Sequence, residues 1–137
     1  MIILDSSFLI ALKIENDVHH EAAARIMKEI AGYKYGKPVI TDYIFDETVT
    51  GIFAKSKRLK LAIEFGNEIL NSLEIFDVND KIFSNAWETF QNQKNTDTDF
   101  SFTDSTIIAV MKENQIRNIA SFDNDFTKIK DFNVILS

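Results

Sequence analysis

Residues 1–13, MIILDSSFLIALK, contain the pattern that decides the fold. Residues 2–4 form a short apolar run, which predicts a buried strand that ends at the carboxylate of Asp5. The segment 6–13 then has helical periodicity, and Ser6 or Ser7 can cap its first turn. A buried strand that turns at once into a helix is the repeating unit of parallel sheets, so this stretch predicts an α/β protein.

The same alternation of short apolar runs and helical segments continues to the end of the chain. Further strands are expected over 38–41, 74–78, 118–122 and 133–136. Further helices are expected over 19–34, 42–53, 59–73, 80–93 and 103–114. The segment with Gly36 and the single Pro separates one helix from the next strand, and the polar stretch 92–99 reads as a loop. Short apolar strands between helices are typical of a parallel sheet covered on both faces, so we expect a three-layer α/β/α sandwich.

Length and composition are those of one globular domain, and we assign residues 1–137 to it. Hydrophobic residues make up 45% of the chain and Phe contributes 12 positions, which is enough for a real core. The absence of Cys excludes disulfides, thiolate zinc sites and a cysteine nucleophile. The N-terminus resembles neither a signal peptide nor a membrane span, so we expect a cytoplasmic protein without membrane contact.

The formal net charge of −6 bears directly on function. Proteins that bind nucleic acids usually carry surplus Lys and Arg, so this charge argues against a polyanionic partner. The argument weakens if many of the acidic residues form a site for divalent cations, because bound cations cancel that charge where the substrate would lie. An acidic surface also suits a partner with a basic segment.

Two carboxylates directly follow predicted strands. Asp5 comes after the strand 2–4, and Asp123 comes after the apolar stretch 118–122. The carboxyl ends of parallel strands meet at one edge of the sheet, where the ligands of such folds bind. We therefore expect Asp5 and Asp123 to lie close together despite their separation in sequence, although either one alone can be explained as a helix or turn cap.

A third carboxylate, Asp104, falls in the first turn of the helix expected over 103–114, where Thr103 can be the cap. An acidic residue at a helix N-terminus can be purely structural. However, Asp104 has the i, i+3, i+4 and i+7 spacing with three apolar residues, Ile107, Ile108 and Met111. That spacing puts the carboxylate on the buried stripe of the helix, where burial is costly unless a metal ion or hydrogen-bond donors compensate it.

Carboxylates gathered at one edge suit a hard divalent cation such as Mg²⁺, which prefers oxygen ligands. A bound ion can lower the pKa of a water molecule and stabilise charge on a phosphate, which permits phosphodiester hydrolysis without a side-chain nucleophile. The adjacent His19 and His20 point about 100° apart on a helix and cannot clamp one ion as an i, i+4 pair would, so we interpret them as surface residues.

In order and spacing, four segments of the chain resemble PIN-domain nucleases, in particular the VapC-like toxins of type II toxin–antitoxin pairs. The segments are IILDSS, ITDYIFDET, SFTDSTIIAVMKENQI and IASFDNDF. The resemblance covers nearly the whole chain. It implies an endoribonuclease that acts on RNA, a homodimer, and a small antitoxin that blocks the site. It also implies that Mg²⁺ or Mn²⁺ is held by four acidic residues, with polar support from Ser7, Ser121 and Asp125; the acidic residues are Asp5, Glu47, Asp104 and Asp123.

Glu47 rests on the resemblance alone. On a helix over 42–54 the apolar stripe centres on Phe45, Val49 and Ile52, and Glu47 points nearly opposite to it. Asp46 flanks the stripe and is the alternative fourth acidic residue. The side of the helix that carries Glu47 also carries Gly51 and Ala54, small residues that could leave room for a ligand.

The densest group of positive charges in the sequence lies between residues 55 and 60. It consists of Lys55, Lys57, Arg58 and Lys60. Such a run usually forms a solvated helix entry, but it is the best candidate in this sequence for contact with RNA phosphates or with a protein partner.

Two other functions remain open. Asp5 could be the nucleophile of a phosphatase or phosphotransferase. Enzymes resembling haloacid dehalogenases have a second Asp two positions further on, where this chain has Ser7. The second alternative is a non-catalytic PIN-like binding module, against which the retention of all four acidic residues argues. The sequence does not separate a toxin from a housekeeping nuclease, and it does not identify the RNA.

Overall fold

The computed structural model describes residues 1–136. The elements in chain order are β1 (Ile2–Leu4), α1 (Ser6–Lys13), α2 (His20–Ala31), β2 (Pro38–Thr41), α3 (Asp42–Ser56), α4 (Leu59–Ser72), β3 (Glu74–Phe76), α5 (Asp80–Asn92), the 3₁₀ helix η1 (Gln93–Asn95), α6 (Phe102–Glu113), β4 (Asn118–Ala120), the 3₁₀ helix η2 (Asn124–Lys128) and β5 (Asn133–Ile135).

The strands form one five-stranded sheet in the order β3-β2-β1-β4-β5, and every neighbouring pair is parallel. The chain first adds strands on one side of β1 and then crosses to add β4 and β5 on the other side. The order therefore reverses between β1 and β4, and in open parallel sheets the crevice at such a reversal is where ligands bind.

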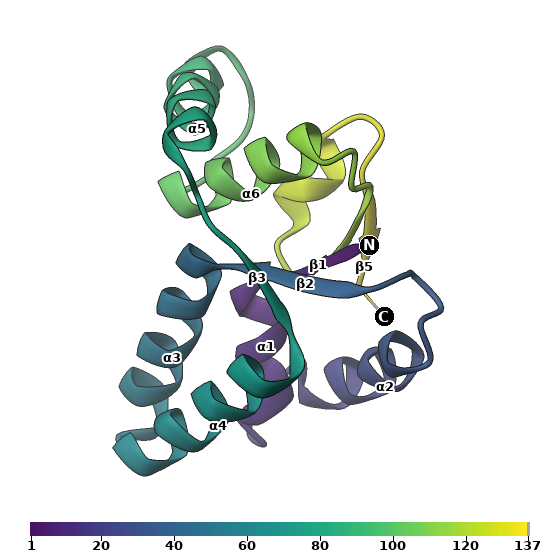
Figure 1. Cartoon of the computed structure of the whole chain (residues 1–137), viewed down its shortest axis with the longest axis vertical. Coiled ribbons are helices and arrows are strands. Elements are labelled where there is room, and N and C mark those ends of the chain that lie inside the picture. The colour runs from purple at the N-terminus through teal and green to yellow at the C-terminus, as the bar shows by residue number, and fades with distance from the viewer. Residues whose placement is uncertain (137) are drawn as a thin grey trace.

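Helices cover both faces of this sheet, so the predicted α/β/α sandwich is confirmed. Helices α1 to α4 lie on one side of the sheet, and α5 and α6 lie on the other (Figure 1). The strands β1 and β2 are almost fully buried, as expected for a sheet covered on both faces. Helix α6 is buried over seven consecutive residues, Ser105 to Met111, so it is the more deeply buried of the two helices on its side of the sheet.

Local capping resolves one alternative and corrects one prediction. At α1 the cap is Asp5, whose side chain accepts the Ser6 N–H, as one of the two sequence interpretations allowed, and neither serine is the cap. At α6 the cap is Ser101 rather than Thr103, so the helix begins one residue earlier than predicted. Ser101 and Asp104 form a capping box in which each side chain accepts the other's backbone N–H.

None of the helices within residues 1–136 is both long and apolar enough to cross a membrane.

Candidate active site

Asp5 occupies the centre of the site, directly after the middle strand of the sheet. Its side chain is 3% exposed. One carboxylate oxygen accepts the Ser6 N–H at 2.7 Å, and the other accepts the hydroxyls of Ser7 at 3.0 Å and Ser121 at 2.7 Å. Burial raises the pKa of Asp5 against these three hydrogen bonds, which lower it, and the nearby charge of Glu47 raises it further.

The two serines connect Asp5 to the segment that follows β4. The Asp5 N–H donates to the Ala120 carbonyl, so β1 and β4 remain paired up to the site. Ser121 Oγ accepts the Asp123 N–H at 3.0 Å, while Ser7 Oγ accepts the Phe122 N–H at 3.1 Å. The network therefore holds the backbone that carries Asp123 against Asp5. Asp123 also caps η2 by accepting the Asp125 N–H, which is the structural role that its sequence position allowed.

Asp104 approaches this pair from the first turn of α6. The pKa of Asp104 is raised from 3.8 to about 7. Burial is the largest cause, the negative charge of Asp5 is the second, and the charge of Asp123 adds a smaller rise. The buried stripe that we used to place Asp104 does not distinguish it, because the helix is buried on all sides just after it. Asp104 also belongs to the capping box of α6, which fixes the orientation of its side chain in the first turn of the helix.

Glu47 reaches the site from α3. Its carboxylate accepts the Ser6 hydroxyl at 2.5 Å, while Asp46 is exposed and accepts the Thr50 hydroxyl. The buried stripe of α3 was predicted at the wrong residues. It was expected to centre on Phe45, Val49 and Ile52, whereas the buried residues are Ile44, Thr48 and Ile52. The reason is that α3 packs against two helices, α1 and α4, and not against one apolar surface.

Close packing of α1 against α3 explains how Glu47 is positioned. A Cβ added to Gly51 would lie 2.5 Å from Ile10 Cδ1, so the glycine allows the two helices to approach. Gly51 lies one turn after Glu47, so both occupy the face of α3 that meets α1. The space beside Gly51 is filled by Ile10, which contradicts our expectation that it leaves room for a ligand.

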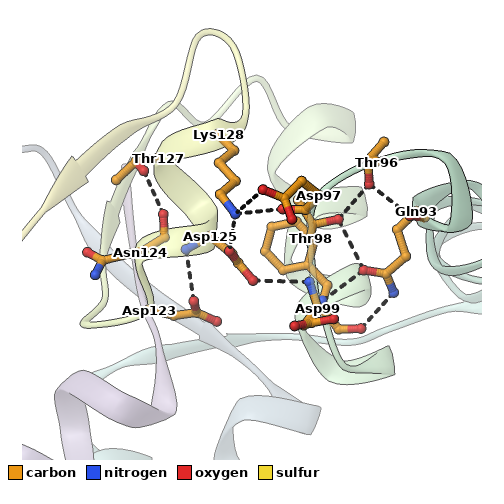
Figure 2. Close-up of polar contacts among 11 residues, drawn as sticks. Gln93, Thr96, Asp97, Thr98, Asp99, Asp123, Asn124, Asp125, Thr127 and Lys128 are labelled. Atoms are coloured by element: carbon orange, nitrogen blue, oxygen red, sulfur yellow. Dashed lines mark hydrogen bonds and ion pairs between the residues drawn. The ribbon is translucent and has the colours of Figure 1, made fainter.

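Asp125 connects the site to the loop that precedes α6 (Figure 2). Its carboxylate accepts the Asp99 N–H at 3.1 Å and pairs with Lys128 at 2.9 Å. Lys128 also donates to the Asp97 carbonyl at 2.5 Å. The ion pair lowers the pKa of Asp125. Together Asp125 and Lys128 bind η2 to the segment 97–99, between the elements that carry Asp123 and Asp104.

The donor set fits a hard divalent cation. Within residues 1–136, none of the four acidic residues pairs with a Lys, Arg or His side chain, while the pKa values of Asp5 and Asp104 are raised by burial and by neighbouring carboxylates. A cation would relieve that unfavourable burial of negative charge. No group of three or more His, Asp or Glu side chains in the described chain is already arranged to hold an ion. Magnesium commonly takes one or two carboxylates and keeps several waters, so a smaller set suffices.

The basic residues predicted to contact RNA do not join this cluster. They lie at the turn between α3 and α4, which projects away from the sheet (Figure 1). Lys55 is eight residues beyond Glu47, about 12 Å along the helix axis. Its ammonium group instead lies 3.9 Å from Asp17. The other members of the run, Lys57, Arg58 and Lys60, are exposed at the same distant end.

Two residues that we did not single out as site residues lie at the edge of the carboxylates. Ser6 donates to Glu47, and the ring of His19 stacks on Phe122. Ser6 was readable as a polar residue beside Asp5, but we considered it only as a cap. Nothing in the sequence indicated the position of His19, because its stacking partner is about a hundred residues further along the chain.

A parallel sheet with carboxylates near its strand-order reversal fits the family that the sequence motifs resemble. The PIN-domain family matches residues 2–131, and the chain therefore belongs to that family, as its sequence motifs indicated.

Individual relatives agree with this assignment. The 23S rRNA-specific endonuclease VapC20 of Mycobacterium tuberculosis is 26% identical over 129 residues, which are 93% of this chain and 92% of that protein. The crystal structure of VapC20, a sarcin–ricin loop cleaving toxin, matches with a TM-score of 0.81 at 25% identity, over 93% of this chain and 94% of that one.

Two more distant structures share the fold. VapBC2 from Rickettsia felis, bound to a DNA fragment from its promoter, matches with a TM-score of 0.74 at 16% identity. The match covers 98% of this chain and 97% of the matched chain. A toxin–antitoxin complex from Klebsiella pneumoniae has a TM-score of 0.69 at 15% identity, with coverages of 97% and 96%.

Proposed function

We propose that this PIN-domain protein is a metal-dependent endoribonuclease, the toxin of a toxin–antitoxin pair. The observation that carries the proposal is that Asp5, Glu47, Asp104 and Asp123 come from four different elements to one edge of the sheet without a basic side chain to neutralise them. The similarity to VapC20, a ribosomal RNA endonuclease, supports RNA as the substrate class.

In the proposed mechanism Asp5, Asp104 and Asp123 would hold Mg²⁺ or Mn²⁺, directly or through water, and Glu47 would orient the attacking water or a second ion. When bound, the cation supplies charge stabilisation at the phosphate and makes water more acidic. Ser7 and Ser121 fix the Asp5 carboxylate in one orientation, and Ser6 does the same for Glu47. Water attacks phosphorus, the P–O3′ bond breaks, and the products are a 5′-phosphate and a 3′-hydroxyl.

The decisive experiment measures RNA cleavage with Mg²⁺ or Mn²⁺ against an EDTA control. Asp5→Asn and Asp104→Asn are expected to abolish cleavage, whereas Asp46→Asn is the matched control because that acidic residue is exposed and outside the cluster. Full activity in both site variants would refute the assignment. Hydrolysis of phosphomonoesters in place of RNA would favour the alternative phosphatase, and no hydrolysis with retained RNA binding would favour a non-catalytic module.

A partner protein is part of the proposal. An apolar groove of about 320 Å³ runs between α3 and α4, and its rim exposes Phe53, Leu59, Ile63 and Leu70. We propose that it takes the apolar face of an amphipathic helix of the antitoxin, because the groove is lined by apolar side chains of two neighbouring helices. Co-expression with the product of a neighbouring short reading frame should yield a complex, and Ile63→Lys should prevent it without loss of ribonuclease activity. Complex formation unaffected by this change would place the antitoxin elsewhere.

A further inference from the structure

His19 and Phe122 form a stacked pair at the edge of the carboxylate cluster. Their ring centroids are 4.3 Å apart and the ring planes differ by 6°. Phe122 is half-buried and its ring also lies 6.2 Å from that of the fully buried Phe8. The pair is therefore anchored on the core at one end and open to solvent at the other, since His19 is exposed.

Two hydrogen bonds and one sequence neighbour connect this pair to the proposed catalytic residues. The Phe122 N–H donates to Ser7 Oγ, and that hydroxyl donates to the Asp5 carboxylate. Phe122 also immediately precedes Asp123 in the chain. The exposed His19 ring is therefore connected to Asp5 and Asp123 through its stacking partner Phe122.

Apart from its stacking on Phe122, the His19 side chain makes no hydrogen bond or ion pair within residues 1–136. It stands at the start of α2 but makes no capping hydrogen bond there; the backbone N–H of His19 is bound by Asp17 instead. Among residues 1–136 neither ring nitrogen of His19 makes a hydrogen bond, whereas the ring of the neighbouring His20 bonds to the Ala11 carbonyl. One face of the His19 ring and both of its nitrogens remain for a ligand.

We propose that His19, supported by Phe122, stacks against a nucleobase beside the scissile phosphate. Splayed bases of single-stranded RNA commonly stack on aromatic and histidine rings. Stacking also suits this chain, because it contributes affinity without requiring the surplus of positive charge that the protein lacks. This inference rests on the proposed ribonuclease function and adds to it a site for one base of the substrate.

The test separates base stacking from catalysis. In an Asp5→Asn background with Mg²⁺, single-stranded oligoribonucleotides that carry 2-aminopurine at successive positions are titrated with protein. One position should lose fluorescence through stacking, and His19→Ala should abolish that change and raise the RNA Kd about tenfold, the loss expected for one base stack. In the active chain His19→Ala should raise KM by a similar factor and leave kcat within about twofold.

Two further variants make the readout specific. His19→Phe retains a stacking ring and should restore both the fluorescence change and the RNA affinity. Tyr33→Ala removes an exposed aromatic ring from the segment before β2, at the opposite edge of the parallel sheet, and should change neither.

Unchanged Kd, KM and fluorescence in His19→Ala, with RNA cleavage intact in the parent chain, would overturn this inference and leave the proposed function standing. Loss of self-association in His19→Ala with unchanged stacking would show that the ring contacts protein, which also overturns it. A parent chain that neither cleaves nor binds RNA would remove the proposed function first.

Discussion

Asp104 is the carboxylate whose pKa is raised to about 7, mainly by burial and then by Asp5. Because the pKa of an unfolded Asp is near 3.8, the folded chain binds the extra proton between pH 3.8 and pH 7, and its stability falls as the pH rises through that window. Asp104→Asn removes this penalty and keeps an acceptor for the Ser101 N–H. Without divalent ions, we expect the variant to gain several degrees of Tm over the parent at pH 8 and almost nothing at pH 4.

Divalent ions should reverse that difference. Under the proposed function, Mn²⁺ binds the folded parent and raises its Tm, but raises that of Asp104→Asn much less. Thermal unfolding at pH 8 with EDTA and with Mn²⁺ measures both effects. An equal Mn²⁺ shift in the two proteins would remove Asp104 from the ligand set, and a constant difference in Tm from pH 4 to pH 8 would contradict the raised pKa.

Thr48 offers a second prediction for a single residue. Its hydroxyl is fully buried on α3 and has no hydrogen-bond partner within the described chain. Thr48→Val replaces that hydroxyl with a methyl group of similar size, which should stabilise the fold by about 1 kcal/mol. Thr41→Val is the matched control: Thr41 is equally buried, but its hydroxyl caps α3 by accepting the Ile44 N–H, so its loss should destabilise by about 1 kcal/mol. Chemical denaturation of both variants measures the contrast, and an equal sign of the two changes would refute it.

Individual residues also show where sequence reasoning reaches its limit. Asp5 and Asp123 were placed by a rule about strand ends, which needs no knowledge of side-chain packing. The position of Glu47 depends on how α1 and α3 approach each other at Gly51, and that contact involves residues about forty positions apart. A helical wheel assumes one buried face, so it misplaced the stripe on a helix that is packed on two sides.

At the scale of elements, Asp125 and Lys128 bind η2 to the loop before α6 (Figure 2). Lys128→Ala should loosen residues 96–100, because their backbone loses the Lys128 contact and the Asp125 carboxylate loses the pairing that fixes it. Hydrogen exchange should become faster in this segment, while the Tm of the whole protein barely changes, since exposed ion pairs contribute little to global stability.

Lys130→Ala provides the control for this exchange experiment. Lys130 is exposed in the same C-terminal region and takes no part in an ion pair among the described residues. Its substitution should leave exchange of the loop unchanged. If Lys128→Ala also left it unchanged, the segment would be held by the Gln93 side chain, which bonds to the backbone of Phe100 at both its N–H and its carbonyl.

Elements themselves were predictable because apolar runs and helical periodicity are local properties. Their exact ends were less so. Ser101 was not identified as the cap of α6, because Thr103 is an equally good capping residue by type and only the capping box with Asp104 distinguishes the two. The distance between the basic run and the carboxylates was also hidden, since it depends on the direction in which α3 leaves the sheet (Figure 1).

At the scale of the whole molecule, alternation of strands and helices was sufficient to predict a parallel α/β/α sandwich. It did not predict the strand order, in which β4 pairs with β1 rather than with β3. That pairing puts Ser121 against Asp5 and so creates the site. The local sequence pattern cannot predict this pairing, because both edge strands of the sheet β3-β2-β1 could accept β4 as a parallel neighbour.

An exposed group of aromatic rings determines our last prediction, the oligomeric state. Phe83 and Trp87 of α5 are 46% and 51% exposed, and both rings contact Phe102 at the start of α6. Large exposed aromatic patches usually mark contact surfaces, and the family resemblance implies a homodimer, so we expect a second copy to cover this patch.

Multi-angle light scattering should then give about twice the 15.7 kDa mass of the chain, and Trp87→Lys should reduce the measured mass to that of one chain. Tyr33→Lys changes a comparably exposed aromatic ring outside the patch and should leave the dimer intact. A dimeric Trp87→Lys protein would place the interface elsewhere, and a monomeric parent would contradict the dimer itself. Because Phe102 lies two residues before Asp104, loss of the dimer should also lower RNA cleavage if the second copy helps to fix the first turn of α6.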